Sequence, residues 1–277
     1  MEMLSLGYSP CPNDTFIFYA LANSRIETGN LQFREILGDV ETLNQMACRA
    51  ELDITKVSFH ALGYLRDDYV LLRSGAALGK GCGPLVVART ACGMQDLQGK
   101  KIAIPGRLTT AFLLLQLFNP ALGDRVTVMP FHLIIDAVRN GDVDAGLIIH
   151  ESRFTYQKAG LHQVIDLGTW WEDLTGLPIP LGGIIAKRSL GPGRITLISA
   201  CIRRSIEYAF ENPKEPKGYI KHHAQELDDA VIEQHIRLYV NNYSRELGED
   251  GLRAVREFFR MSEEQGLIQR SLKQLME

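Results

Sequence analysis

The chain has 277 residues, of which 45% are hydrophobic and 23% are charged, and its formal net charge is −3 at pH 7. This composition fits a globular protein of one large or two modest domains, and the lack of a basic block argues against nucleic acid as a partner. No apolar run approaches the roughly 20 residues of a membrane-spanning helix, so we expect no membrane partner either. The first residues show no export signal and the five cysteines are irregularly spaced, which together predict a cytoplasmic protein with reduced thiols.

The first predicted unit is a strand, a tight loop and a helix. Residues 4–8 alternate in a β-prone pattern, a loop with two prolines follows, and an apolar helical run begins at Phe16. Asn13 and Asp14 stand just before that run and are residue types that cap helices. The open N-terminus of such a helix presents unpaired N–H groups, so this loop can hold an anion.

The same order of strand, loop and helix recurs later in the chain. Residues 101–104 form the predicted strand, residues 105–108 the loop, and residues 109–115 the start of the helix. A strand–helix–strand unit also occurs twice, at residues 31–36, 40–50 and 51–58 and again at residues 125–129, 133–139 and 141–150. This alternation predicts two similar α/β lobes with mainly parallel sheets.

Two β-prone segments bracket the second lobe. Residues 85–89 follow a glycine-rich turn, and residues 181–187 show the same order of glycine, paired apolar residues, alanine and a basic residue. We predict that these segments are two crossing strands that form a hinge. Lobe 1 then consists of residues 1–88 and 185–277, and lobe 2 spans residues 89–184. Three amphipathic stripes near the C-terminus predict helices that pack on lobe 1.

Two other motifs do not indicate a cofactor site. The glycine motif at residues 79–83 is followed by a strand rather than a helix, which argues against a nucleotide loop. His222 and His223 lie in a polar helical stretch without further ligands at zinc spacing. We therefore expect no metal centre from the sequence pattern.

His150 is the histidine with the most distinctive position. It ends the apolar run at residues 147–149, and ligands collect at the carboxyl ends of strands in open α/β sheets. A histidine there can act as a base near neutral pH. The alternative is a histidine that forms only a local hydrogen bond at the strand end, and position alone leaves both interpretations open.

Ser58 is the counterpart of His150 in the first lobe when Asp53 is aligned with Asp144. Its hydroxyl either faces His150 across a cleft or serves only the local turn. Asn44 lies inside a predicted helix among apolar neighbours, and it is either a cleft contact or a surface residue.

Thr110 and Ala111 open the helix of the second lobe. A helix start needs a cap whatever its function, so a purely structural role is one interpretation. In the functional interpretation, the Thr110 hydroxyl and the N–H groups of both residues hold a carboxylate. A small molecule that carries a carboxylate is therefore the ligand class that we expect.

Four segments together resemble one enzyme family. Residues 9–16, with the sequence SPCPNDTF, look like the N-terminal signature of the 1,4-dihydroxy-6-naphthoate synthases of the futalosine route to menaquinone. Residues 53–58, 109–111 and 146–151 also resemble that family and fall in the expected order. The resemblance extends over about the full chain, and its first segment is the most specific.

The resemblance implies a type 2 periplasmic-binding-protein fold used as a cytoplasmic enzyme. Members of the family convert cyclic de-hypoxanthine futalosine into 1,4-dihydroxy-6-naphthoate and release a small dihydroxy carbonyl fragment. They are carbon–carbon lyases without a metal or redox cofactor. By position, His150 is the implied proton acceptor. The implied substrate contacts are Lys56, Val57, Ser58, Thr110 and Ala111, with Asn44 as a further contact.

The motifs in the sequence are consistent with the reaction that the resemblance implies. An aromatic carboxylate suits an open helix N-terminus, and a fragmentation begun by proton removal needs one base in a closed, dry cleft between hinged lobes. The first alternative is the chorismate dehydratase of the same pathway and fold, against which residues 9–16 argue. The second is a non-catalytic solute-binding protein, which predicts an export signal or a lipid anchor, and neither is visible.

Overall fold

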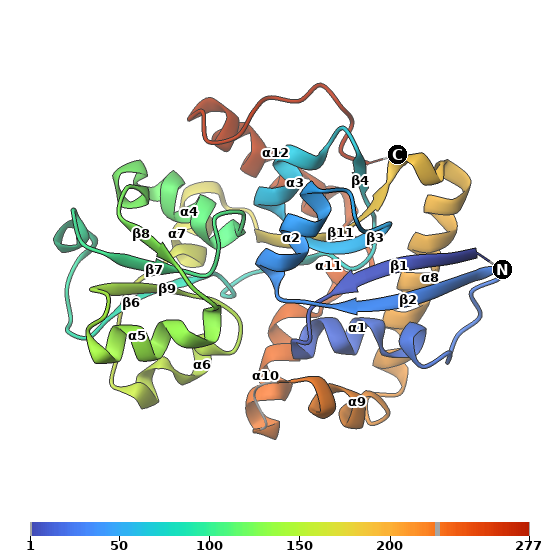
Figure 1. The fold of residues 1–277 in the computed structure, drawn as a ribbon, viewed down its shortest axis with the longest axis horizontal. Helices are drawn as coiled ribbons and strands as arrows, with labels where there is room; N and C mark the ends of the chain where they lie inside the picture. Colours follow the sequence, from blue (N-terminus) through green and yellow to red (C-terminus); the bar gives the residue numbers. More distant parts are fainter. Residues whose placement is uncertain (1, 225–227, 277) are drawn as a thin grey trace.

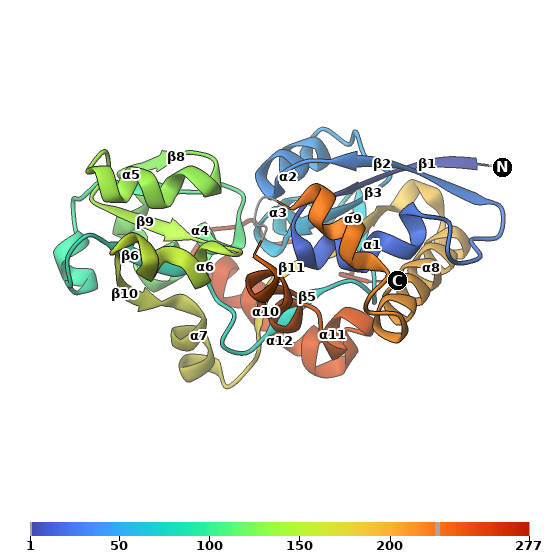
Figure 2. The same cartoon turned by 90° about the horizontal axis from the view of Figure 1, so that it is seen from below.

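The computed structural model describes residues 2–224 and 228–276, and it contains two α/β lobes, each built on one sheet (Figure 1 and Figure 2). The sheet of the first lobe has the strand order β2 (Leu31–Leu37), β1 (Glu2–Tyr8), β3 (Ile54–Ser58), β11 (Ile179–Lys187) and β4 (Tyr69–Leu71), with β5 (Ala77–Gly79) also paired to β11. The sheet of the second lobe has the order β10 (His162–Asp166), β6 (Leu85–Ala88), β9 (Ala145–Ile148), β7 (Ile102–Ile104) and β8 (Val126–Val128).

Both sheets are mixed. β1 runs parallel to β2 and β3, and β7 runs parallel to β8 and β9, so the repeated units form the parallel pairs that the sequence predicts. β11 is antiparallel to β3, β4 and β5, and β6 is antiparallel to β9 and β10. The expectation of mainly parallel sheets therefore holds for the repeated units, whereas the strands that follow the lobe crossings run the other way.

The strand pairing shifts the lobe limits from those that the sequence pattern predicts. β6 pairs within the second sheet, so residues 85–88 lie with lobe 2 rather than with lobe 1. β11 pairs within the first sheet from Ile179 onward, so residues 179–184 lie with lobe 1. Each of these two strands pairs only with strands of one sheet. The predicted hinge strands therefore follow the two crossings between the lobes and do not themselves span both sheets.

Helices cover both sheets (Figure 1). They are α1 (Pro12–Ala22), α2 (Val40–Cys48), α3 (Phe59–Leu65), α4 (Thr110–Phe118), α5 (Ile134–Asn140), α6 (Ser152–Thr155), α7 (Leu167–Thr175), α8 (Pro192–Glu211), α9 (Pro216–His223), α10 (Asp229–Tyr239), α11 (Asn242–Arg245) and α12 (Gly248–Glu264). Short 3₁₀ helices lie at Met94–Leu97, Pro120–Gly123, Phe131–Leu133, Tyr156–Ala159 and Arg188–Leu190. Within residues 2–224 and 228–276, no helix has both the length and the apolar character that crossing a bilayer requires.

The C-terminal helices differ in how they pack. Ile202 of α8 and Ile232 of α10 share a hydrophobic core with Phe18 of α1, which confirms the predicted packing on lobe 1 for these helices. α12 differs from these helices in that it also contacts lobe 2. The ring of Phe258 in α12 lies 5.6 Å from the ring of Trp171 in α7. This aromatic pair helps to join the lobes on one side of the molecule.

The start of α1 differs from the cap that the sequence predicts. The helix begins at Pro12, with Cys11 as its N-cap and no capping side chain. Proline suits this position because the first N–H groups of a helix lack helical partners in any case. Asn13 and Asp14 therefore lie inside the first turn, where their side chains form contacts other than caps.

Candidate active site

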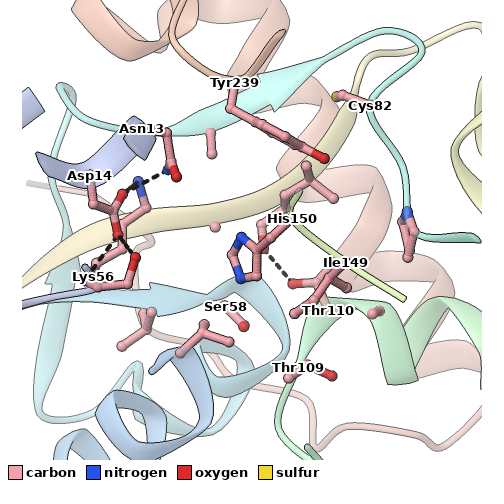
Figure 3. Close-up of a pocket in the computed structure, with 18 of the residues that line it drawn as sticks. Asn13, Asp14, Lys56, Ser58, Cys82, Thr109, Thr110, Ile149, His150 and Tyr239 are labelled. Carbon is pink, nitrogen blue, oxygen red and sulfur yellow. Dashed lines mark hydrogen bonds and ion pairs between the residues drawn. The ribbon is translucent and has the colours of Figure 1, made fainter. Parts of the chain in front are cut away.

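A cavity lies between the two lobes (Figure 3). From the first lobe it is lined by Ser9, Asn13, Asp14, Val40, Leu43, Lys56, Val57, Ser58, Ala77, Leu181, Gly182 and Tyr239. The crossing segment before β6 adds Cys82, Gly83 and Pro84, and the second lobe adds Thr109, Thr110, Ala111, Ile149 and His150. The structure thus brings together the predicted His150, residues 56–58 and residues 110–111, whereas Asn44 does not line the cavity.

The N-terminus of α4 opens into this cavity (Figure 3). Thr109 caps the helix as its hydroxyl oxygen accepts from the Phe112 N–H at 3.3 Å. Thr110 and Ala111 are the first helical residues, whose N–H groups have no partner within an α-helix. The Thr110 hydroxyl donates to the Leu181 carbonyl at 2.6 Å. Since a hydroxyl has one hydrogen, the backbone N–H groups are the donors left for a carboxylate.

Asn44 holds Ser58 in place. Its amide oxygen accepts from the Ser58 N–H at 2.9 Å, and its amide nitrogen donates to the Ser58 hydroxyl and to the Leu108 carbonyl, both at 3.3 Å. Asn44 is fully buried, so it is neither the cleft contact nor the surface residue that the sequence predicts. Because the Ser58 hydroxyl accepts from Asn44, its own hydrogen remains for a ligand in the cavity.

Further contacts join the lobes beside the cavity. The Glu41 carboxylate of α2 accepts from the N–H groups of Arg107 and Leu108, each at 3.1 Å, and burial raises the pKa of this carboxyl group. Nδ1 of His60 lies 3.2 Å from the Thr109 carbonyl oxygen, and burial lowers the pKa of His60 to about 4. These contacts hold α2 and α3 against the loop before α4, so the structure shows the lobes closed.

Asp14 and Lys56 form a buried ion pair in the cavity wall (Figure 3). Nζ of Lys56 lies 3.2 Å from Oδ1 of Asp14 and donates to the Gly75 carbonyl at 2.9 Å. Oδ2 of Asp14 accepts from the Ser9 hydroxyl at 2.7 Å. The sequence pattern predicts Asp14 as a helix cap and so misses this role. The available signal was its position shortly after the carboxyl end of β1, because ligands collect at the carboxyl ends of strands.

His150 follows β9, and its ring lies among the residues that line the cavity (Figure 3). Its backbone is left-handed, with a φ of +56°. This conformation is strained for a residue with a side chain, and such strain clusters at functional sites. The imidazole ring lies 5.0 Å from the ring of Phe131. Burial lowers the pKa of His150 below its ordinary value of 6.5, and the Glu151 charge opposes that shift. The ring is therefore neutral near pH 7, which is the form that accepts a proton.

His235 of α10 lies beside His150, and the sequence pattern does not single it out. The two rings are nearly parallel, at 11°, with centroids 6.1 Å apart. Nε2 of His235 lies 2.9 Å from Oδ1 of Asn13, and Nδ1 lies 3.8 Å from Oε2 of Glu151. No local signal points to these contacts, because His235 and Asn13 are separated by 222 positions in the chain.

One group in the described part of the chain has the spacing of a metal site. Cys11, His150 and Glu151 each offer a ligand atom, and these atoms lie within 4.8 Å of one another. Sulfur, imidazole and carboxylate are donor types that suit Zn²⁺. A metal on His150 would occupy the lone pair that a base needs, so the two uses of this residue exclude each other.

Known proteins resemble the chain over nearly its whole length. Residues 4–264 match a family model described as menaquinone biosynthesis. A protein of Thermus thermophilus named 1,4-dihydroxy-6-naphthoate synthase is 52% identical over 267 residues, which cover 96% of each chain. A Streptomyces coelicolor protein of the same name is 48% identical over 271 residues, covering 96% of this chain and 95% of its own.

Solved structures share the architecture. Protein AF1704 of Archaeoglobus fulgidus has a TM-score of 0.90 at 38% identity, over 96% of this chain and 98% of its own. A Candida albicans gene product, titled as having the generic periplasmic binding protein fold, has a TM-score of 0.71 at 13% identity, with coverages of 98% and 92%. The alkanesulfonate-binding protein SsuA of Xanthomonas axonopodis has a TM-score of 0.73 at 14% identity, with coverages of 97% and 94%. These similarities confirm the predicted periplasmic-binding-protein type of fold, and the match over residues 4–264 shows that the chain belongs to the menaquinone biosynthesis family.

Proposed function

We propose that the chain is a 1,4-dihydroxy-6-naphthoate synthase, a cytoplasmic carbon–carbon lyase that converts cyclic de-hypoxanthine futalosine into 1,4-dihydroxy-6-naphthoate. The observation that carries the proposal is the position of His150, a neutral imidazole on a strained turn at the wall of a closed cavity. The same cavity contains an open helix N-terminus. The names of the relatives support the reaction, and the cavity offers the groups that this reaction needs.

The start of α4 binds the substrate carboxylate. The N–H groups of Thr110 and Ala111 form charge-assisted hydrogen bonds with it, and the helix dipole adds to the attraction. The Lys56 ammonium already pairs with Asp14, so it attracts the substrate carboxylate only weakly compared with the start of α4. The Ser58 hydroxyl, oriented by Asn44, donates its hydrogen to another oxygen of the substrate.

His150 then acts as the base. Its neutral ring removes the proton of a substrate hydroxyl. The oxygen lone pair then forms the carbonyl of the released fragment as the carbon–carbon bond to that fragment breaks. The electron pair of that bond stays on the ring system that becomes the naphthoate, which takes a proton back from the imidazolium. The reaction is thus a cleavage without net proton change. The contacts that close the lobes restrict the access of water to the cavity during these steps.

A product assay tests the proposal against its alternatives. The purified chain is incubated with cyclic de-hypoxanthine futalosine, and formation of the naphthoate is followed by absorbance and mass spectrometry. Chorismate is tested in parallel, because a chorismate dehydratase would consume it. Conversion of the cyclic substrate with chorismate untouched is the expected result. Binding of the cyclic substrate without conversion would overturn the proposal in favour of a solute-binding protein.

A further inference from the structure

Two buried polar atoms near His150 have no hydrogen-bond partner among the residues that the structure describes. They are Oε2 of Glu151 and Nδ1 of His235, and they lie 3.8 Å apart. The side chain of His235 is fully buried, and that of Glu151 is 12% exposed. Burying polar atoms without a partner is costly, so two such atoms side by side need an explanation.

The hydrogen-bond network fixes which nitrogen of His235 carries a hydrogen. The Asn13 amide nitrogen donates to Asp14 at 2.9 Å, which orients the Asn13 amide oxygen toward Nε2 of His235, also 2.9 Å away. An amide oxygen can only accept, so Nε2 is the donor. In a neutral ring, Nδ1 then presents a lone pair to the carboxylate of Glu151. These two groups repel each other unless a proton lies between them.

A proton on one of the two side chains removes this repulsion, because one group can then donate to the other. At 3.8 Å the two atoms lie just outside hydrogen-bond range, so the bond forms when the side chains move slightly closer together.

The pair spans both lobes at the turn that carries His150. Glu151 follows His150 directly after β9 of lobe 2, whereas His235 belongs to α10, which packs on α1 of lobe 1. His150 has a strained backbone, and its ring lies parallel to the ring of His235. Anchoring Glu151 to His235 therefore fixes the strained turn and the ring of the base once the lobes are closed.

We propose that Glu151 and His235 are positioning residues for His150, joined across the closed cleft by one hydrogen bond. This inference rests on the proposed function, because the pair has this role only if His150 is the base. The contacts continue from His235 through Asn13 to Asp14 in the cavity wall. The pair thus connects the turn of the base to the part of the cavity that lobe 1 supplies.

Variants at both positions separate a shared hydrogen bond from mere packing. Glu151→Gln keeps the side-chain shape and offers an N–H to Nδ1 of a neutral His235, so kcat should stay within about threefold of wild type. Glu151→Ala removes the bond and should lower kcat by about tenfold or more, with KM changed less than about threefold. His235→Phe keeps a ring against His150, but it also loses the bond from Nε2 to Asn13, so it should lower kcat at least as much as Glu151→Ala. The double variant should be no slower than His235→Phe, because the Glu151 change then has no further bond to remove.

Glu207→Ala is a control away from the cavity. Glu207 accepts from Arg203 at 2.9 Å on the exposed face of α8, so kcat should not change. Circular dichroism and binding of 1,4-dihydroxy-6-naphthoate check that each variant folds. If Glu151→Ala does not fold, His235→Phe and Glu151→Gln carry the comparison. Wild-type kcat in the alanine or phenylalanine variant, or effects that multiply in the double variant, would overturn the proposal.

His150→Asn is measured in the same series to separate this inference from the proposed function. If His150→Asn loses turnover while Glu151→Ala and His235→Phe do not, the positioning role is wrong and the proposed function stands. If His150→Asn turns over at nearly the wild-type rate, the proposed function itself is wrong.

Discussion

Backbone strain and side-chain chemistry coincide at residue 150. A histidine at a φ of +56° places its ring where a relaxed strand end would not, and the surrounding burial keeps that ring neutral. Such a strained conformation persists only if neighbouring groups hold the turn in place. The rings of Phe131 and His235 and the side chain of Glu151 are the neighbours that do so.

The pH dependence of turnover follows from the lowered pKa of His150. The neutral ring is the active form, and its pKa in the folded protein lies below 6.5, so kcat should be constant above that pH. As the pH falls further, the ring takes up a proton and kcat should decline with a slope of about one. Measuring kcat between about pH 5 and 8 checks this. An acid limb with its midpoint above pH 6.5 would contradict the assignment.

Single residues differ in how well the sequence predicts them. His150 and Ser58 stand at strand ends, where ligands collect, and both line the cavity as that position predicts. Asn44 does not line the cavity, and the sequence pattern does not distinguish a ligand contact from a buried amide that holds its neighbours, here Ser58. His235 could not be predicted, since its partners come from distant parts of the chain and its own helix gives an ordinary amphipathic pattern.

At the scale of elements, the N-terminus of α4 is expected to bind the substrate through its backbone. Thr110→Val removes the hydroxyl that contacts Leu181, whereas Thr110→Pro also removes the N–H. Proline is tolerated here, because residue 110 is the first helical position and Thr109 before it is extended. We expect Thr110→Pro to raise KM about tenfold or more above Thr110→Val, as a hydrogen bond to a charged group contributes about 1.5–3 kcal/mol.

Steady-state kinetics of the two variants provide the comparison, and their melting temperatures confirm that α4 forms in each. Equal KM values for Thr110→Pro and Thr110→Val would show that the N–H of residue 110 does not bind the substrate.

The elements show why a sequence predicts some parts of a fold better than others. The repeated strand–helix–strand units follow from local periodicity, and their parallel pairing is the simplest way to connect them. The positions of β6 and β11 depend on which distant strands they pair with, and their composition does not record that choice. α12 likewise has an amphipathic pattern that fits packing on either lobe, and in the structure it contacts both.

At the scale of the whole molecule, we expect closure of the lobes to depend on a glycine at residue 106. A Cβ at Gly106 would overlap the Glu41 carboxyl group, which bonds to the N–H groups of Arg107 and Leu108. Gly106→Ala should therefore favour the open state and raise KM with less effect on kcat. Gly193→Ala in α8 is the matched control, because a Cβ there meets nothing within 4 Å.

Solution scattering measures this effect directly. With saturating 1,4-dihydroxy-6-naphthoate, wild type and Gly193→Ala should be more compact than Gly106→Ala. The same radius of gyration for all three proteins, with unchanged KM, would show that the Glu41 contact does not control closure.

The most direct test of the central claim is a single-turnover comparison of wild type with His150→Asn, with enzyme in excess over cyclic de-hypoxanthine futalosine. Asparagine tolerates a left-handed backbone and keeps a polar side chain, so the fold and substrate binding should persist. It cannot take up the proton, so naphthoate formation should slow by roughly 10²- to 10⁴-fold, the range for a lost general base. A folded His150→Asn variant that forms naphthoate at nearly the wild-type rate would contradict the account and remove His150 from the mechanism.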